Sequence, residues 1–266
     1  MSRTSERSTT VIDLLKFAET ITLDTYVDIG CGDGSITNEI STDLKIAESY
    51  CVDILPNSEK YPKLSFQQIS ENDLKLDIID HSIDLITAFV SLHHIKNIDK
   101  LMDEILRISH HNTILIIREH DVKPEDQPYI DFVHLIEIIK RYDQDSENFI
   151  KTFHSGYFSR LGLKDSLEAI GYKYVASYDY PRSVPNPQKL YTSIFQFSGP
   201  QKSWLTPLVQ STEYKITNGR LLEVLRKVDL TNYYKVLKKN SIFGKKAHLL
   251  LQQSKISEFI KLYQLK

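Results

Sequence analysis

A glycine-rich turn is the segment of this sequence best suited to bind a ligand. Three glycines alternate with other residues in Gly30-Cys31-Gly32-Asp33-Gly34, directly after the strand-like run 26–29. Glycine has no Cβ atom, so the backbone can take unusual φ angles there and a ligand can lie against the main chain. Asp28 precedes the turn, and Asp53 ends the next apolar run. The two carboxylate oxygens of Asp53 can accept hydrogen bonds from both hydroxyl groups of a ribose.

Ionisable residues gather after two later apolar runs. Ser91-Leu92-His93-His94 follows the run 83–89, and Arg118-Glu119-His120-Asp121 follows the run 113–117. The carboxyl ends of parallel strands meet at one edge of a sheet, where open α/β sheets bind ligands, and such groups can move a proton there. The candidate catalytic residues are His94, Arg118, Glu119, His120 and Asp121. The alternatives are that one histidine only packs and that the second group is a loop whose charges pair with each other.

The arrangement of apolar segments predicts the fold that positions these groups. Short runs rich in Val, Ile, Tyr and Phe alternate with longer amphipathic segments, which is typical of a parallel sheet covered by helices. The predicted strands are 26–29, 49–53, 65–69, 83–89, 113–117, 173–180 and 190–197. The last two are separated by a proline-rich stretch too short for a crossover helix, so we expect them to pair antiparallel.

Helices are predicted from the spacing of apolar residues and from end signals. A stripe over 11–18 follows the candidate caps Ser8, Thr9 and Thr10, and 98–108 has apolar residues on one helical face. Further helices are expected over 130–141 and 155–170, the second ending at Gly171.

These motifs together resemble those of the class I S-adenosylmethionine-dependent methyltransferases, a Rossmann-like superfamily. The glycine spacing after Asp28 resembles their first motif. The segment 84–95, which contains Ser91-Leu92-His93-His94, resembles their fourth motif in a form common among small-molecule enzymes. The resemblance covers about residues 10–125 by motif and reaches about residue 198 by topology. A nicotinamide dinucleotide enzyme is the alternative, but its third glycine would stand where this chain has Ser35.

The resemblance implies S-adenosylmethionine as the cofactor. It places Asp28 near the ammonium group of the amino acid moiety and Asp53 at the ribose, and Ser70 or Asn72 would meet the adenine amino group. The cofactor-binding residues that it implies are Asp28, Gly30, Cys31, Gly32, Gly34, Asp53, Ile54, Ser70, Asn72 and Ser91. The methyl group of a sulfonium is already activated. The enzyme therefore mainly aligns an acceptor and, where required, removes a proton.

Composition sets limits on the class of protein. Hydrophobic residues make up 41% and charged residues 26%, and no apolar run approaches the roughly 18 residues of a membrane helix. The first ten residues lack the apolar stretch of a secretory signal, and two cysteines argue against a disulfide framework. We expect a cytoplasmic protein without a membrane contact, in which Cys31 and Cys51 are small buried residues. The spacings of His120, Asp121, His134 and His154 match no metal-ligand pattern, so no metal is predicted.

The charge of the chain divides near residue 200. Residues 1–200 hold 20 Lys and Arg against 31 Asp and Glu, a net charge of −11, whereas residues 201–266 hold 13 against 4, a net charge of +9. We therefore expect a methyltransferase domain over 1–199 and a small basic, mainly helical C-terminal extension over 200–266. Such an extension can bind a nucleic acid or a protein partner, or it can dock on its own acidic domain.

The C-terminal extension bears on the identity of the methyl acceptor. Tyr233, Tyr234 and Phe243 stand among lysines of the extension, which favours RNA, since phosphates attract cations and bases stack on aromatic rings. The Lys-Asp-Lys-Glu tetrad of many RNA 2′-O-methyltransferases is absent, because Arg118 replaces the second lysine and no aspartate follows the fourth strand. The alternatives are a small-molecule acceptor and a non-catalytic binding or scaffold protein that keeps the fold.

Overall fold

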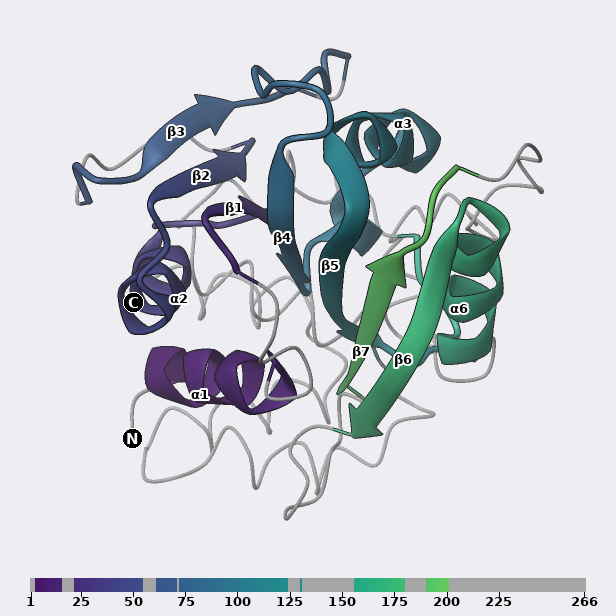
Figure 1. The fold of residues 1–266 in the computed structure, drawn as a ribbon. Helices are drawn as coiled ribbons and strands as arrows, with labels where there is room; N and C mark the ends of the chain where they lie inside the picture. The colour runs from purple at the N-terminus through teal and green to yellow at the C-terminus, as the bar shows by residue number, and fades with distance from the viewer. Residues whose placement is uncertain are drawn as a thin grey trace, which may run out of the picture. The chain divides into compact units, whose positions relative to one another are not determined.

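A seven-stranded sheet is the centre of the computed structural model, which describes residues 3–15, 22–54, 61–70, 72–123, 130, 156–179 and 190–200. The strand order is β3-β2-β1-β4-β5-β7-β6 (Figure 1). The strands are β1 (Thr25–Ile29), β2 (Glu48–Asp53), β3 (Ser65–Gln68), β4 (Ile83–Phe89), β5 (Ser109–His120), β6 (Tyr172–Asp179) and β7 (Leu190–Phe197). The first five strands run parallel, while β7 is antiparallel to both β5 and β6. The predicted antiparallel pair is therefore confirmed, and the sheet has the order and directions that the resemblance to the Rossmann-like methyltransferases implies.

Two pairs of helices cover the two faces of this sheet (Figure 1). Side chains of α1 (Arg3–Leu15) and α2 (Ser35–Leu44) share a buried cluster with one face, and those of α3 (Ile98–Ile108) and α6 (Arg160–Ala169) share another with the opposite face. This is the layered arrangement that alternating strands and amphipathic helices predict. The carboxyl ends of β1, β2, β4 and β5 are left to meet at one edge.

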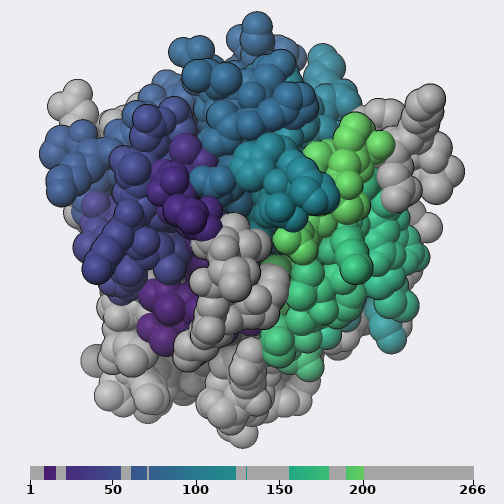
Figure 2. All heavy atoms as spheres, viewed as in Figure 1, coloured from purple at the N-terminus to yellow at the C-terminus, as the bar shows by residue number. Residues whose placement is uncertain are grey.

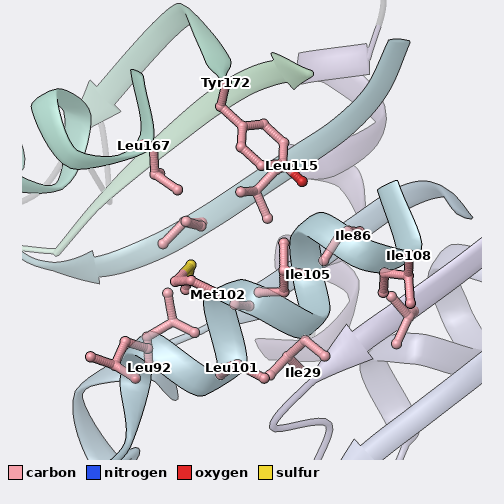
Figure 3. Packing of buried hydrophobic residues seen from close by; sticks show 14 of the residues in the cluster. Ile29, Ile86, Leu92, Leu101, Met102, Ile105, Ile108, Leu115, Leu167 and Tyr172 are labelled. Atoms are coloured by element: carbon pink, nitrogen blue, oxygen red, sulfur yellow. The ribbon is translucent and has the colours of Figure 1, made fainter. Parts of the chain in front are cut away.

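Helix α3 shows why the sequence folds in this way. The residues of its apolar stripe are all buried, and they are Ile98, Leu101, Met102, Ile105 and Ile108. Figure 3 shows this stripe facing the sheet residues Ile29, Ile86 and Leu115. Full burial of one such side chain contributes about 1.5–3 kcal/mol, so the stripe fixes the helix to the sheet. The helix predicted over 98–108 is confirmed.

The starts of two helices differ from the sequence-based expectation. Helix α1 begins at Arg3, so Ser8, Thr9 and Thr10 lie within it and do not cap it. Helix α6 begins at Arg160, because the side chain of Ser159 accepts a hydrogen bond from the amide of Gly162 and forms the N-cap. Its end before Gly171, which has a φ of 107°, is as predicted.

The largest difference concerns β5, which is much longer than the predicted run 113–117. Its residues Arg118, Glu119 and His120 pair with Thr192, Tyr191 and Leu190 of β7. The alternative in which the ionisable group 118–121 forms a loop is therefore wrong for its first three residues. They continue the strand because the antiparallel partner β7 extends beside them.

All these elements belong to one compact unit, formed by Met1–Asp121 and Gly156–Gln210. Within it, β6 and α6 reach the surface in the green region of Figure 2. The other unit comprises Val122–Ser155 and Ser211–Lys266 and lies almost wholly outside the described residues. The predicted helix over 130–141 and the C-terminal extension therefore stay predictions. No described helix is long and apolar enough to cross a membrane.

Candidate functional site

The glycine-rich turn joins β1 to α2 at the carboxyl edge of the sheet. Gly30, Gly32 and Gly34 have φ angles of 77°, 60° and 73°. The amides of Gly30 and Cys31 donate to the carbonyl oxygen of Val52 at 2.7 and 3.2 Å. Residues with a Cβ rarely adopt such φ angles, so the three glycines let the turn fold back onto β2.

Ser91 packs against this turn from the end of β4. Its hydroxyl group donates to the carbonyl oxygen of Ile29 at 2.7 Å. A Cβ atom added to Gly30 would lie 2.3 Å from the Cβ of Ser91, which is closer than real Cβ atoms approach. Gly30 and Ser91, which are 61 residues apart in the sequence, therefore bring the two motifs into direct contact.

The surroundings of Gly32 fit the adenosine part of the predicted cofactor. Nothing in the described part lies within 4 Å of a Cβ atom added to Gly32, so the main chain is open there. The Gly32 amide donates to Oδ2 of Asp53 at 2.7 Å, which holds this carboxylate beside the turn. The next residue, Ile54, is 55% exposed. An open main chain, a carboxylate and an exposed apolar side chain suit a ribose and a base.

Asp28 lies beneath the turn rather than on its open side. The carboxylate is buried and accepts hydrogen bonds from the hydroxyl groups of Thr37 and Thr87, both at 2.7 Å. The hydroxyl group of Tyr26 lies 2.7 Å from that of Thr87 and extends the network. Burial raises the pKa of Tyr26 well above its usual value, and the charge of Asp28 adds to the effect. The network connects β1, β4 and α2 below the turn.

The two residues expected at the adenine are both exposed. The Ser70 hydroxyl accepts the amide of Asp73 at 3.1 Å and closes a tight turn after β3. Asn72 lies within that turn with its side chain at the surface. Their contact with adenine stays a prediction, and Asn72 is the better placed because the Ser70 hydroxyl already serves the turn.

Cys31 and Cys51 are joined by a disulfide bond. Both are buried, as predicted, but the inference that two cysteines argue against disulfide bonding is wrong. The pairing arises because the turn folds back over β2, which brings their Cα atoms to 5.5 Å. Sequence spacing alone carries no signal of this approach.

A buried carboxylate and histidine form the centre of the second group of candidate residues. Glu119 is 1% exposed, and its Oε2 lies 2.7 Å from Nδ1 of His93, which is also buried. Its Oε1 accepts the amide of Leu92 at 3.0 Å and so holds the short 3₁₀ helix η2 (Leu92–His94). Burial raises the pKa of Glu119, while the nearby rings of His120 and His94 act in the opposite direction.

Aromatic rings surround this pair. The His93 ring lies 4.0 Å from that of His94, 5.3 Å from that of His120 and 5.7 Å from that of Tyr157. His120 is buried, whereas His94 is partly exposed. The structure therefore brings Glu119, His120 and His94 together, as the sequence predicts. His134 and His154 lie outside the described residues.

Arg118 and Asp121 contact other elements. Arg118 is fully buried; its Nε donates to the hydroxyl group of Thr192 at 3.2 Å, and its guanidinium lies 5.4 Å above the centre of the Phe89 ring. Asp121 accepts the amide of Arg160 at 2.9 Å at the start of α6. These contacts tie β5 to β7, β4 and α6.

Two residues of this region have no signal in the sequence. Tyr191 lies opposite Glu119 in the register between β7 and β5, and the Arg160 guanidinium lies 4.8 Å above its ring centre. Burial raises the pKa of Tyr191, and the charges of Glu119 and Asp121 raise it further. The pairing of β7 with β5, which the sequence does not specify, places Tyr191 here, and the packing of α6 beside these strands adds Arg160.

Comparison with known proteins places this geometry in a family. The family described as "Methyltransferase domain" matches residues 4–177. No curated protein matches the sequence. Solved structures share the fold at 13–18% sequence identity.

Three of these structures show the extent of the likeness. An S-adenosylmethionine-dependent methyltransferase from Clostridium acetobutylicum has a TM-score of 0.51 at 13% identity, over 74% of this chain and 93% of its own. One from Methanosarcina mazei has 0.50 at 18%, over 69% and 98%. A protein solved in complex with the Trm112 methyltransferase activator of Haloferax volcanii has 0.52 at 13%, over 74% and 95%. The chain therefore belongs to the methyltransferase domain family, within the class I superfamily whose cofactor is S-adenosylmethionine.

Proposed function

We propose that the protein transfers the methyl group of S-adenosylmethionine to an acceptor held at the carboxyl ends of β4 and β5. The observation that carries this proposal is the buried Glu119–His93 pair next to the partly exposed His94. Such a group at the ligand-binding edge of an open α/β sheet is suited to position an acceptor and to receive its proton.

The cofactor would be held by the glycine-rich turn and by β2. Asp53 would accept the ribose hydroxyl groups, and Ile54 offers an apolar contact for adenine. The bound cofactor supplies a methyl group already activated by its sulfonium. The protein then has to align the acceptor atom with it.

On the acceptor side, we assign the direct role to His94. A carboxylate 2.7 Å from Nδ1 favours a proton on that nitrogen of His93, so Glu119 fixes the orientation of the His93 ring. His94 packs on this fixed ring at 4.0 Å and is the more exposed of the two. Its imidazole can therefore reach an acceptor, and the negative charge of Glu119 favours the imidazolium that forms when it takes a proton.

Arg118, Asp121 and His120 are assigned positioning roles. Arg118 and Asp121 contact Thr192 and Arg160, and His120 is buried against the His93 ring. Each would act on the reaction by keeping β5 and η2 in place.

We favour RNA as the acceptor because of the charge of residues 201–266. An excess of nine positive charges with aromatic residues between them suits single-stranded RNA. A small molecule is the alternative, and the enclosed position of Glu119 and His93 favours it. A protein partner for the extension is a third candidate, since one structural neighbour was solved with an activator protein.

The function is tested by a matched pair of histidine variants. A radiolabelled methyl-transfer screen against RNA, protein and metabolite pools first identifies an acceptor. With this acceptor, His94→Ala should reduce turnover at least about tenfold. The affinity of the variant for S-adenosylmethionine, measured by calorimetry, should stay within about twofold of the wild type. His111→Ala is the control, because His111 is exposed at the opposite end of β5. Equal turnover in the two variants would refute the role of His94. A chain that binds the cofactor but methylates no pool would instead be a binding protein.

Salt dependence separates the two classes of acceptor. RNA affinity should fall steeply between about 50 and 200 mM salt. In the full chain, replacement of Lys238, Lys239, Lys245 and Lys246 by Gln should weaken the affinity and flatten its salt dependence. A salt response that these substitutions leave unchanged would contradict RNA binding through the extension.

A further inference from the structure

The disulfide bond between Cys31 and Cys51 lies within the cofactor-binding turn. These are the only cysteines among the 266 residues of the chain. Cys31 stands between Gly30 and Gly32, and Cys51 lies on β2 two residues before Asp53. A chain with two cysteines thus has both of them where it binds its cofactor.

The bond belongs to the same unit as the groups expected to hold the cofactor. The amide of Cys31 donates to the carbonyl oxygen of Val52 at 3.2 Å, and the next amide, that of Gly32, donates to Asp53 at 2.7 Å. A Cβ atom added to Gly34 would lie 3.5 Å from Sγ of Cys51, so the bridge also fills the space below the end of the turn. A movement of either sulfur atom therefore acts on the main chain at Gly32 and on the carboxylate of Asp53.

We propose that Cys31 and Cys51 form a reversible thiol–disulfide site that sets the affinity of the protein for S-adenosylmethionine. Its reaction partner is a dithiol reductant or the corresponding disulfide oxidant. In reduction, a thiolate of the dithiol attacks one sulfur, and the other cysteine leaves as a thiolate and takes up a proton. The second thiol of the reductant then displaces the first cysteine. Two electrons and two protons pass to the protein, and the reductant becomes a cyclic disulfide.

The oxidised form is the one that binds the cofactor tightly. It holds the turn against β2 with Gly32 open and Asp53 oriented, so the cofactor meets a site that is already in place. After reduction the two thiols must separate to van der Waals distance. Both cysteines are buried, so this separation displaces the turn or the end of β2. Part of the binding energy is then spent on ordering the turn again.

Thermodynamic linkage requires a reciprocal effect of the bound cofactor on the disulfide bond. If oxidation raises the affinity for S-adenosylmethionine by some factor, the bound cofactor must favour the disulfide over the dithiol by the same factor. This factor can therefore be obtained from two independent measurements, one of cofactor affinity and one of the thiol–disulfide equilibrium. Neither involves a methyl acceptor, so the test is separate from that of the proposed function.

The first measurement compares dissociation constants for S-adenosylmethionine by calorimetry in the air-oxidised and the dithiothreitol-reduced protein. We expect the oxidised protein to bind at least about fivefold more tightly. Cys31→Ser/Cys51→Ser in the full chain should bind like the reduced protein and should not respond to dithiothreitol. Equal affinities of the oxidised and reduced wild type, or no cofactor binding by either, would overturn the proposal.

The second measurement uses only the wild-type protein and so does not depend on the folding of a variant. The protein is equilibrated with fixed ratios of reduced to oxidised dithiothreitol, and its free thiols are alkylated and counted by mass spectrometry. Saturating S-adenosylmethionine should raise the ratio of reduced to oxidised dithiothreitol at which half of the protein is reduced. The increase should equal the factor measured in the binding experiment. A ratio that the cofactor leaves unchanged, or two free thiols under oxidising conditions, would refute the reversible site.

Discussion

Replacement of Gly30 by alanine tests the contact between the glycine-rich turn and the end of β4. Gly30 has a φ of 77°, which strains a residue with a Cβ atom. In addition, the Cβ and Oγ atoms of Ser91 would lie 2.3 and 2.8 Å from the new methyl group. Because the Cβ of Ser91 is fixed to the backbone, it cannot rotate away. The strain and the overlap therefore act together on Gly30→Ala.

The expected loss of stability follows from these two contributions. A left-handed backbone costs an L residue about 1–2 kcal/mol. Extra atoms forced into a packed site cost about 1–3 kcal/mol. We therefore expect Gly30→Ala to lower the free energy of unfolding by about 2–5 kcal/mol, a large share of the roughly 5–15 kcal/mol that stabilises a protein domain.

Gly32→Ala is the matched control for this substitution. Its φ of 60° brings a similar strain, but no described atom lies within 4 Å of the new methyl group. We expect it to cost only about 1–2 kcal/mol of stability, because the overlap is absent. It should nevertheless weaken S-adenosylmethionine binding, since the methyl group would occupy the open main chain. Gly30→Ala should therefore act mainly on stability, whereas Gly32→Ala should act mainly on the affinity for S-adenosylmethionine.

The assay is urea unfolding followed by circular dichroism, in a double-mutant cycle with Ser91→Gly. Ser91→Gly alone loses the hydrogen bond to Ile29 and should cost about 0.5–1.5 kcal/mol. In the double variant the overlap at Gly30 is relieved, so its loss should be smaller than the sum of the two single losses. The reasoning is refuted if Gly30→Ala costs no more than Gly32→Ala, or if the two single losses simply add.

The other predictions concern three carboxylates. Asp53→Ala should weaken S-adenosylmethionine binding about tenfold or more in calorimetry, because hydrogen bonds to a charged group contribute about 1.5–3 kcal/mol. Asp28→Ala leaves the hydroxyl groups of Thr37 and Thr87 without this acceptor and should lower the free energy of unfolding by about 1–3 kcal/mol in urea. Burial raises the pKa of Glu119, so its contribution to stability is present below about pH 4.3 and is lost as the pH rises through the raised value. Glu119→Gln should remove that part of the pH dependence of unfolding, and an unchanged profile would contradict the raised pKa.

Much of the fold follows from patterns within single segments. The stripe of α3 has the period of one helical face, and the largely apolar sequence of β4 is what a strand buried on both faces requires. The glycine spacing locates the turn because positive φ angles favour that residue. Such features depend on neighbours in the sequence, so a single sequence is enough to find them.

The features that the sequence did not predict depend on contacts between distant segments. Three ionisable residues stay in β5 because residues of β7, which lie 70 or more positions later in the sequence, pair beside them. Glu119 is buried because the amide of Leu92 and the ring of His93 form hydrogen bonds with its carboxylate. The bond between Cys31 and Cys51 likewise needs the turn to fold over β2. Local hydrophobicity predicts a loop at the end of β5, and only the tertiary partners reverse that preference.

The two halves of the site are built in different ways, and this difference has a consequence for the reaction. The half proposed for the cofactor is held in shape mainly by main-chain amides: those of Gly30 and Cys31 donate to the carbonyl oxygen of Val52, and that of Gly32 donates to the carboxylate of Asp53. The half proposed for the acceptor consists mainly of side chains on β5 and η2, whose partners lie on separate elements. Alternate residues of a strand point to opposite faces, so Glu119 acts on one layer of the fold and Arg118 on the other. Substitution in the acceptor half can therefore change the acceptor while the turn keeps its shape, whereas a change in the turn acts on cofactor binding whatever the acceptor is.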